Sequence, residues 1–199
     1  MLDFTLRGIG VNDYLKYFDR ERYLFEDVHQ RFHAEHSLGA FDFFTIIIWK
    51  ANRAKSKIAL KLLAKDPEGR RDLDAICRTL TASLYSATNH KERLRLLMKD
   101  WNFALPMASA ILSVCWPEDF TVYDYRVRER LVGFPKLNSL TDFESIWKGF
   151  KEYKAKVAEI APAELSLREK DRYLYGESTA LQLNKDIRLL FQVESEGEI

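Results

Sequence analysis

Glycine and proline are scarce in this chain, with eight and five among 199 residues. Both are common in the turns of many-stranded proteins, so their scarcity favours long helices over a β fold. The longest apolar stretch, 43–49, is far shorter than the ~20 residues needed to cross a bilayer. The first residues also lack the basic and apolar regions of a secretory signal peptide. We therefore expect a soluble, cytoplasmic protein with no membrane partner.

Cysteine is also rare. Cys77 and Cys115 both lie in apolar helical contexts, which predicts reduced core thiols rather than a disulfide. The chain has no glycine-rich phosphate loop, serine nucleophile elbow or Cys/His catalytic signature. These absences exclude the commonest nucleotide-binding and acyl-transfer enzymes, and we expect no cofactor.

Histidine offers one candidate metal site. Four potential ligands fall on one helical face, namely Glu26, His29, His33 and His36. Two or three of them could hold a transition metal. An exposed polar face on an amphipathic helix explains the same spacing, and we favour that interpretation, with no metal bound.

Charge is balanced overall but unevenly distributed. The formal net charge is +1, yet residues 50–71 hold eight basic and two acidic residues. The C-terminus is acidic through Glu194, Glu196 and Glu198. Such asymmetry is typical of a protein with one phosphate-facing side. A solvated helix face is the alternative explanation.

Hydrophobic periodicity predicts helices along nearly the whole chain. They are expected from 10–13 onward, over 24–37, 41–53, 58–63 and 73–85, and over 178–191 after a C-cap at Gly176. Segment 41–53 is apolar nearly all round, so a strand is the less favoured alternative there. Capping boxes are predicted at Thr141–Glu144 and Ser166–Glu169. The fold class is therefore all-α.

The segments 101–112 and 120–124 are the most informative. Pro106 suits the first helical position, where its missing N–H costs nothing. Ala108, Ser109 and Ala110 then allow close approach of a neighbouring backbone. Asp124 stands where an N-cap is expected before 125–131. A carboxylate at this place, near a turn that could present N–H groups to phosphate, indicates a site for chemistry on DNA.

These segments resemble the helix-hairpin-helix DNA glycosylases of the endonuclease III type. That family carries a Leu-Pro-Gly-Val/Ile-Gly hairpin, an alanine-rich helix and a catalytic aspartate opening the next helix. The family's Gly-Val-Gly falls on Asn102-Phe103-Ala104, and its aspartate falls on Asp124. Both hairpin glycines are missing, so Asn102 and Ala104 must adopt conformations that glycine adopts more cheaply. Pro106 replaces the lysine of bifunctional members, which implies an enzyme without lyase activity.

The resemblance implies two helical lobes with the active site in the cleft between them. Residues 89–137 would form the hairpin lobe, and 1–88 with 138–199 the second lobe, within a single compact unit spanning 1–199. We expect a monomer.

The resemblance also implies a substrate, double-stranded DNA with a damaged or modified base that is flipped out of the helix. The role would be base-excision repair or defence against viruses with modified DNA. Asp124 would stabilise the positively charged sugar as the base leaves, or orient the attacking water. Predicted backbone-binding residues are Asn102, Phe103, Ala104, Leu105, Arg126 and Arg128. Predicted base-pocket residues are Trp49, Lys50, Arg53, Trp101, Tyr123 and Tyr125.

Two alternatives stay open. Asp124 can be a plain N-cap, and each aromatic residue can be plain core. The chain would then be a non-catalytic helical module that binds DNA or another protein on the same scaffold.

Overall fold

The computed structural model describes residues 15, 17–65, 69 and 72–195. Every regular element among them is helical, which confirms the all-α fold class. The described residues form two compact units. Unit 1 holds the residues up to Trp101 together with Val114–Trp116, and unit 2 holds Asn102–Ser113 and the residues from Pro117 onward. The predicted lobes have other boundaries, since 89–101 belongs to unit 1 and 102–137 lies almost wholly in unit 2.

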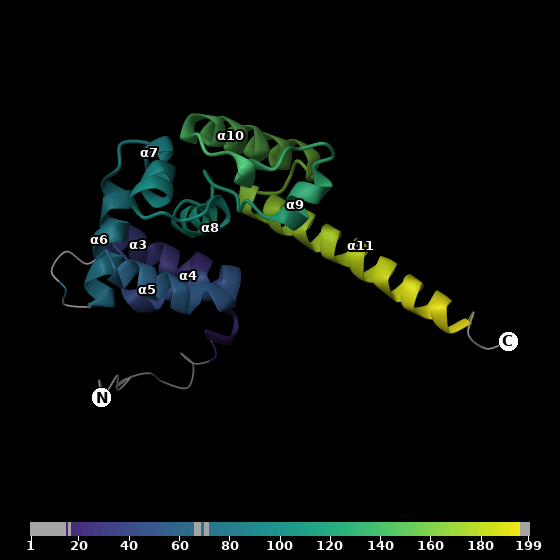
Figure 1. Ribbon diagram of the computed structural model, residues 1–199, viewed down its shortest axis with the longest axis horizontal. Coiled ribbons are helices and arrows are strands. Elements are labelled where there is room, and N and C mark those ends of the chain that lie inside the picture. The colour runs from purple at the N-terminus through teal and green to yellow at the C-terminus, as the bar shows by residue number, and fades with distance from the viewer. Residues whose placement is uncertain (1–14, 16, 66–68, 70–71, 196–199) are drawn as a thin grey trace. The chain divides into compact units, whose positions relative to one another are not determined.

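Unit 1 is built from short helices around an apolar core (Figure 1). Its elements are α2 (Arg20–Tyr23), the π-helical turn η1 (Leu24–Val28), α3 (His29–Glu35), α4 (Ala40–Ala51), the 3-10 turn η2 (Asn52–Ala54), α5 (Lys55–Leu63), α6 (Leu73–Ser86), α7 (His90–Arg95) and the π-helical turn η3 (Leu96–Asp100). Helix α4 contacts both α5 and α6. Its side chains Phe43, Ile46 and Ile47 are fully buried. The segment 41–53 is thus helical, with one buried face, and is not a strand.

The ends of these helices follow local chemistry. Helix α3 ends where His36 adopts a left-handed conformation, with φ 58°. Asp72 caps α6 by accepting hydrogen bonds from the N–H groups of Asp74 and Ala75. Asn89 caps α7 in the same way. The helix predicted from residues 10–13 begins outside the described residues.

Unit 2 contains α8 (Leu105–Cys115), α9 (Tyr125–Arg130), the 3-10 turn η4 (Leu137–Ser139), α10 (Phe143–Ile160) and α11 (Leu167–Ser195). The last two residues of α8 belong to unit 1. Pro106 is the second residue of α8 rather than the first, still within the turn where its missing N–H costs nothing. The core of unit 2 is aromatic: Phe120, Phe150 and Tyr153 are almost fully buried.

Two predicted caps were wrong. Asp142, not Thr141, caps α10, since its Oδ2 accepts from the N–H of Ser145 at 2.7 Å. Gly176 does not end a helix, because α11 runs unbroken from Leu167 to Ser195. The residues flanking this glycine hold the helix together, since Leu174 and Ser178 are buried within unit 2. The capping box at Ser166 and Glu169 is confirmed by reciprocal hydrogen bonds.

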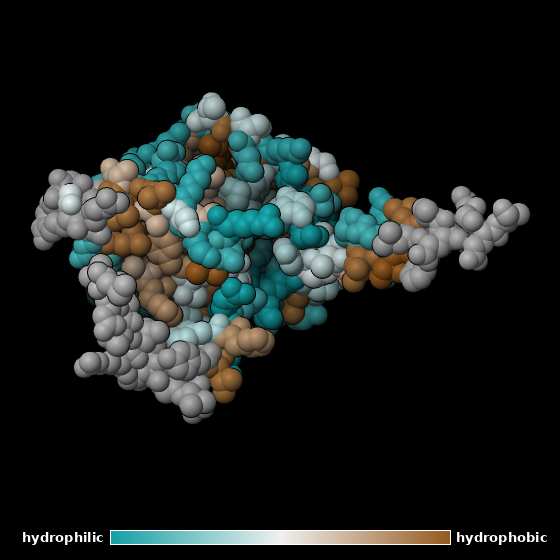
Figure 2. Space-filling view, turned by 60° about the horizontal axis from the view of Figure 1, so that its bottom comes forward, coloured by the Kyte–Doolittle hydropathy of each residue, from teal (hydrophilic) through white to brown (hydrophobic). Residues whose placement is uncertain are grey.

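The C-terminal part of α11 extends beyond the other helices of unit 2 (Figure 1). It is exposed on all described sides, and Figure 2 shows apolar surface on this segment. Leu181, Leu183, Ile187 and Leu189 account for that surface. No helix among the described residues is long and apolar enough to cross a membrane.

Candidate functional site

The chain leading into α9 is fixed through its backbone. The N–H of Tyr123 donates to Ser109 Oγ on α8 at 2.8 Å. Tyr153 on α10 donates its hydroxyl to the carbonyl of Val122 at 3.1 Å and accepts from the N–H of Asp124 at 3.4 Å. Ser109 thus has a definite role in the small-residue segment of α8. These bonds set the position from which the Asp124 side chain emerges.

Side chains of the same stretch are anchored in the core. Tyr123 is only 3% exposed, and its hydroxyl accepts from the N–H of Leu137 at 2.8 Å. Thr121 donates to Asp171 Oδ1 at 2.9 Å, and Arg168 donates to Oδ2 of the same carboxylate at 2.8 Å. Tyr123 is therefore part of the interior of unit 2. Any exposed stacking surface beside Asp124 must come from its neighbours.

Asp124 is the N-cap of α9. Its backbone is extended, with φ −123° and ψ 143°, and its Oδ1 accepts from the N–H of Arg126 at 2.9 Å. The predicted capping role is thus confirmed. The residue is half-buried, so the carboxylate is held in place while part of the residue reaches solvent. This combination is compatible with both interpretations of Asp124, a structural cap and a reactive group.

Beside Asp124 lies a surface of aromatic rings and one arginine. Tyr125 is 56% exposed, and Tyr175 on α11 is 46% exposed. The guanidinium carbon of Arg126 lies 5.2 Å from the ring centre of Tyr125 and 5.8 Å from that of Tyr175. Exposed rings interleaved with a cation suit base stacking and phosphate attraction.

Tyr175 was missed by the sequence reasoning because it is 50 positions from Tyr125 and its neighbourhood suggested a helix end. Only the packing of α9 against α11 brings the two together. An ion pair between Arg130 and Glu177, at 2.8 Å, also joins these two helices. Arg128, also predicted to contact DNA, is half-buried on the same helix.

The predicted hairpin turn has the expected backbone at one position only. Asn102 has φ 56°, a left-handed conformation that glycine adopts more easily. The same expectation for Ala104 was wrong, since its φ is not positive. Ala104 instead precedes α8, and its carbonyl accepts from the N–H groups of Met107 and Ala108, both at 3.0 Å. Phe103 and Leu105 are buried, so only the turn's backbone and the exposed Asn102 and Ala104 are available to a ligand.

The other predicted base-pocket residues lie in unit 1. Trp49 is half-buried and packs edge-on against Phe25, with ring centres 5.7 Å apart. Trp101 is half-buried where η3 ends. Lys50 lies in the last turn of α4, and Arg53 is exposed in η2.

These two basic residues open a basic surface that continues along α5. It comprises Lys50, Arg53, Lys55, Lys57, Lys61 and Lys65, with no acidic residue between positions 50 and 65. Four of the six are exposed and the other two are half-buried. Partial burial, with Lys57 and Lys65 nearby, lowers the pKa of Lys61. The repulsion between Lys61 and its two lysine neighbours is relieved when a polyanion binds.

The histidines on the second predicted helix have structural roles. The ring Nδ1 of His29 donates to the carbonyl of Val114 at 3.0 Å, and Nε2 of His33 donates to that of Cys115 at 2.8 Å. Both carbonyls end α8, whose last turn has no basic residue of its own. His36 stacks on Tyr85, with ring centres 3.9 Å apart. Within the described ranges no three His, Cys, Asp or Glu residues are placed to hold a metal ion.

A hollow of about 260 Å³ lies past the C-terminal end of α9, lined partly by Arg130, Phe134 and Lys156. Asp124, at the opposite end of this helix, does not line it.

Comparison with protein-family models, curated proteins and solved structures finds no match for this chain.

Proposed function

We propose that this chain is a monofunctional DNA glycosylase, with Asp124 as its catalytic carboxylate. The observation that carries the proposal is the left-handed backbone of Asn102, at the position of the first hairpin glycine in the family that the sequence resembles. The helix that follows begins at Leu105, and the next one is capped by Asp124. This succession of turn, helix and N-cap supports the proposal.

The chemistry assigned to Asp124 is hydrolysis of an N-glycosidic bond. The bond between C1′ and the base nitrogen breaks, and the base leaves with the electron pair. Positive charge then develops on the sugar, where a carboxylate stabilises it. Water attacks C1′, and the proton that it loses ends on the departing base, which leaves an abasic site and a free, neutral base. The Asp124 carboxylate accepts from the N–H of Arg126, and the Tyr153 hydroxyl accepts from the backbone N–H of Asp124, so the carboxylate needs little reorganisation as charge develops.

Access to the base requires that the nucleotide leaves the helical stack, at a cost of a few kcal/mol. Tyr125 and Tyr175 offer exposed rings on which a displaced base can stack, and Arg126 between them can contact phosphate. The turn at 102–105, in the same unit as Asp124, supplies further contacts to the DNA backbone. Pro106 provides no amine for a Schiff base, so the strand stays intact after the base is removed.

Asp124→Asn is the decisive variant. Asparagine caps helices as well as aspartate does, so the fold and the DNA affinity should persist while the charge is lost. We expect the native protein to produce alkali-labile sites in at least one member of a panel of duplexes with damaged or modified bases. Asp124→Asn should produce none. Asp142→Asn makes the same change at the cap of α10 and should keep full activity.

A second candidate is a non-catalytic DNA-binding module. It is favoured by the burial of Tyr123 and by the use of the Asp124 carboxylate as a cap. In this case the native protein and Asp124→Asn would bind DNA equally, with an affinity that falls steeply with salt concentration. Neither protein would yield an abasic site on any duplex. Absence of DNA binding by the native protein would refute both candidates.

A further inference from the structure

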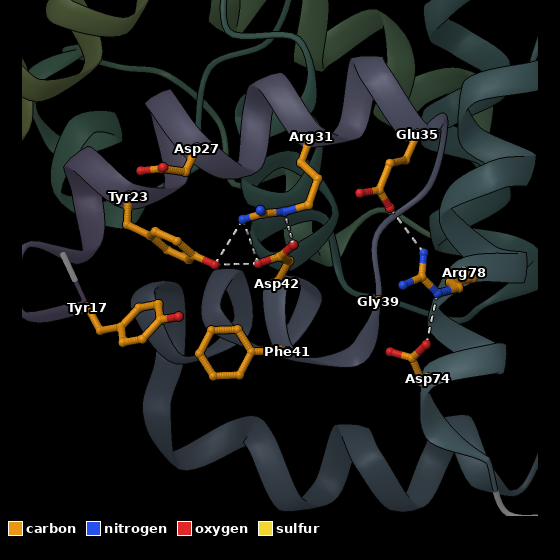
Figure 3. A pocket seen from close by; sticks show the side chains of 10 residues that line it. All are labelled: Tyr17, Tyr23, Asp27, Arg31, Glu35, Gly39, Phe41, Asp42, Asp74 and Arg78. Carbon is orange, nitrogen blue, oxygen red and sulfur yellow. Dashed lines mark hydrogen bonds and ion pairs between the residues drawn. The ribbon is translucent and has the colours of Figure 1, made fainter. Parts of the chain in front are cut away.

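Charged residues of unit 1 are arranged in two different ways. Around a hollow lined by side chains from α2, η1, α3, α4 and α6, arginines and carboxylates pair with each other (Figure 3). Arg31 Nε donates to Asp42 Oδ2 at 2.7 Å. Arg78 donates to Asp74 at 2.8 Å and to Glu35 at 3.3 Å. These charges offset one another, whereas the basic surface that continues along α5 is built in the opposite way.

Helix α5 carries its lysines in a row. Lys57, Lys61 and Lys65 follow at intervals of four residues, so they lie along one side of the helix, about 6 Å apart. Lys65 stands in the turn directly after the helix, where its N–H donates to the carbonyl of Leu62 at 3.0 Å. Partial burial and the two neighbouring lysines lower the pKa of Lys61. The three charges are therefore close enough to repel, and like charges four residues apart weaken a helix.

The start of α5 is unfavourable as well. Its N-cap is Ala54, whose side chain cannot accept a hydrogen bond from the first N–H groups. Lys55 and Lys57 stand in the first turn, where the helix dipole favours acidic residues. Helix α6 of the same unit follows both rules, since Asp72 caps it and Asp74 lies in its first turn. A local arrangement that weakens a helix is expected where function requires it.

Two lysines of the basic surface are held in place by neutral groups. Lys55 Nζ donates to Asn52 Oδ1 at 2.9 Å, and Lys65 Nζ donates to the backbone carbonyl of Asp100. Neither bond cancels the positive charge of the lysine. Positions 50–71 hold eight basic and two acidic residues, so pairing within this stretch cannot neutralise it. The surface is therefore suited to a partner that carries many negative charges.

A membrane is not the partner that this helix fits best. A basic helix binds a lipid surface by burying its apolar face among the lipids. In α5 that face is already used, because Ile58 and Leu62 are buried in unit 1. Leu60 is 64% exposed, but one leucine offers little apolar area for insertion.

The composition of the basic surface favours the backbone of a nucleic-acid duplex. The stretch 50–65 has no aromatic residue, and aromatic rings are the usual platform for single strands. Five of its six cations are lysines, which attract phosphate as point charges rather than reading base edges through paired hydrogen bonds. A duplex carries one negative charge per about 1.7 Å of its axis. The lysine row, about 12 Å long, therefore meets several phosphates wherever it lies on the duplex.

We propose that the basic surface of unit 1 binds the phosphate backbone of double-stranded DNA, without regard to sequence or to damaged bases. The choice of DNA as the polyanion rests on the function proposed above. The contact itself does not involve Asp124, which belongs to unit 2. Binding of this kind holds the protein on undamaged DNA and lets it move along the duplex.

The test is the affinity of the full-length protein for an undamaged DNA duplex, measured by fluorescence anisotropy over a range of salt concentrations. Lys57→Gln/Lys61→Gln removes two charges of the row, and glutamine forms helices about as well as lysine. We expect this double variant to bind at least about tenfold more weakly at about 0.1 M salt. The logarithmic dependence of its binding constant on salt should be shallower by about 1.8, because each phosphate contact contributes about 0.9. An unchanged affinity would overturn the proposal.

A matched control removes the same net charge elsewhere. Lys148→Gln/Lys151→Gln changes two exposed lysines of α10, where Glu144 and Glu152 each lie one turn from Lys148. Charges away from a contact are screened by salt, so the affinity should change by less than about twofold. An equal loss in the two double variants would mean an effect of net charge alone and would overturn the assignment to α5.

Two further variants separate charge from folding. Lys57→Arg/Lys61→Arg keeps both charges, so its affinity should stay within about twofold of the native value. Lys57→Gln alone, at an exposed position, should make the salt dependence shallower by about 0.9 and serves if the double variant does not fold. A loss in the arginine variant as large as that in the glutamine variant would show that charge is not responsible.

Other polyanions are separate outcomes of the same measurement. Vesicles containing phosphatidylserine, a polyglutamate peptide and an RNA duplex of the same sequence are titrated in the same way. We expect none of them to bind more tightly than the DNA duplex. Tighter binding to any of the three, lost in Lys57→Gln/Lys61→Gln, would overturn the choice of DNA.

The glycosylase proposal and the DNA-binding surface can fail separately. If no duplex loses a base but Lys57→Gln/Lys61→Gln weakens DNA binding, the glycosylase proposal fails and the surface stands. If base removal requires Asp124 while the α5 variants bind DNA as the native protein does, the surface fails and the glycosylase stands.

Discussion

Removal of one hydroxyl group should measure how much the hydrogen bonds between Tyr23 and the ion pair of Arg31 with Asp42 contribute to the stability of unit 1. Tyr23 is 5% exposed, and its hydroxyl donates to Asp42 Oδ1 at 2.6 Å while it accepts from Arg31. Tyr23→Phe keeps the ring and its edge-to-face contacts with Tyr17 and Phe41 but removes both hydrogen bonds. A hydrogen bond to a charged group contributes about 1.5–3 kcal/mol. Asp42 keeps its bond to Arg31, so the loss should be about 2 kcal/mol.

Urea denaturation followed by tryptophan fluorescence suits this measurement, because Trp49, Trp101 and Trp116 all belong to unit 1. The midpoint should fall with little change in the slope of the unfolding free energy against urea. Tyr173→Phe, at a tyrosine that is 45% exposed, serves as control and should change nothing measurable. A loss in Tyr23→Phe below about 0.5 kcal/mol, the usual size of a surface effect, would refute this account of the hydroxyl's hydrogen bonds.

The same hydroxyl should make stability sensitive to alkaline pH. Burial, and then the hydrogen bond to Asp42, raises the pKa of Tyr23 above its ordinary value. Because the pKa of Tyr23 is raised in the folded state, its hydroxyl contributes fully to stability below the pKa of an unfolded tyrosine, about 10. This contribution is lost as the pH rises above that value. Native stability should therefore fall more steeply above about pH 10 than that of Tyr23→Phe. Parallel pH profiles would contradict this explanation.

Two further predictions concern glycines and thiols. A Cβ at Gly149 would lie 2.4 Å from Cδ2 of the buried Leu137. Gly149→Ala should therefore destabilise unit 2 by about 1 kcal/mol, even after the gain in helix propensity. A Cβ at Gly176 would have nothing within 4 Å, so Gly176→Ala should stabilise unit 2 by a similar amount. Thermal denaturation of both variants tests this, and equal shifts of one sign would contradict it. Cys77 and Cys115 are buried, free thiols, as predicted, and burial raises the pKa of Cys77 to about 12. A thiol reagent at pH 8 should label neither in the native protein and both in urea, whereas rapid native labelling would show that a thiol is accessible.

Local signals in the sequence predicted much of the fold. The caps at Asp124 and Ser166 were predicted because a capping side chain and its N–H partner lie within three residues. Thr141 was preferred over Asp142 because both residues can cap, and the sequence alone does not decide between them.

Features that depend on distant residues were missed. Gly176 matched a helix end, but burial of Leu174 and Ser178 keeps α11 continuous through it. His29 and His33 matched a ligand pair, while their partners are carbonyls more than 80 positions away. Tyr175 likewise comes to lie beside Arg126 only when separate helices pack together, which periodicity does not reveal.

The small part of α8 that belongs to unit 1 has a consequence for dissecting the protein. His29 and His33 bond the carbonyls of Val114 and Cys115, and the ring of Trp116 lies 5.0 Å from that of Phe32. A fragment ending at residue 101 would lose all of these partners and expose a fully buried phenylalanine. A fragment that ends at residue 101 should therefore be less stable than unit 1 of the whole protein. When fragments 1–101 and 102–199 are co-expressed they should associate, because residues 114–116 of the second fragment contact His29, Phe32 and His33 of the first.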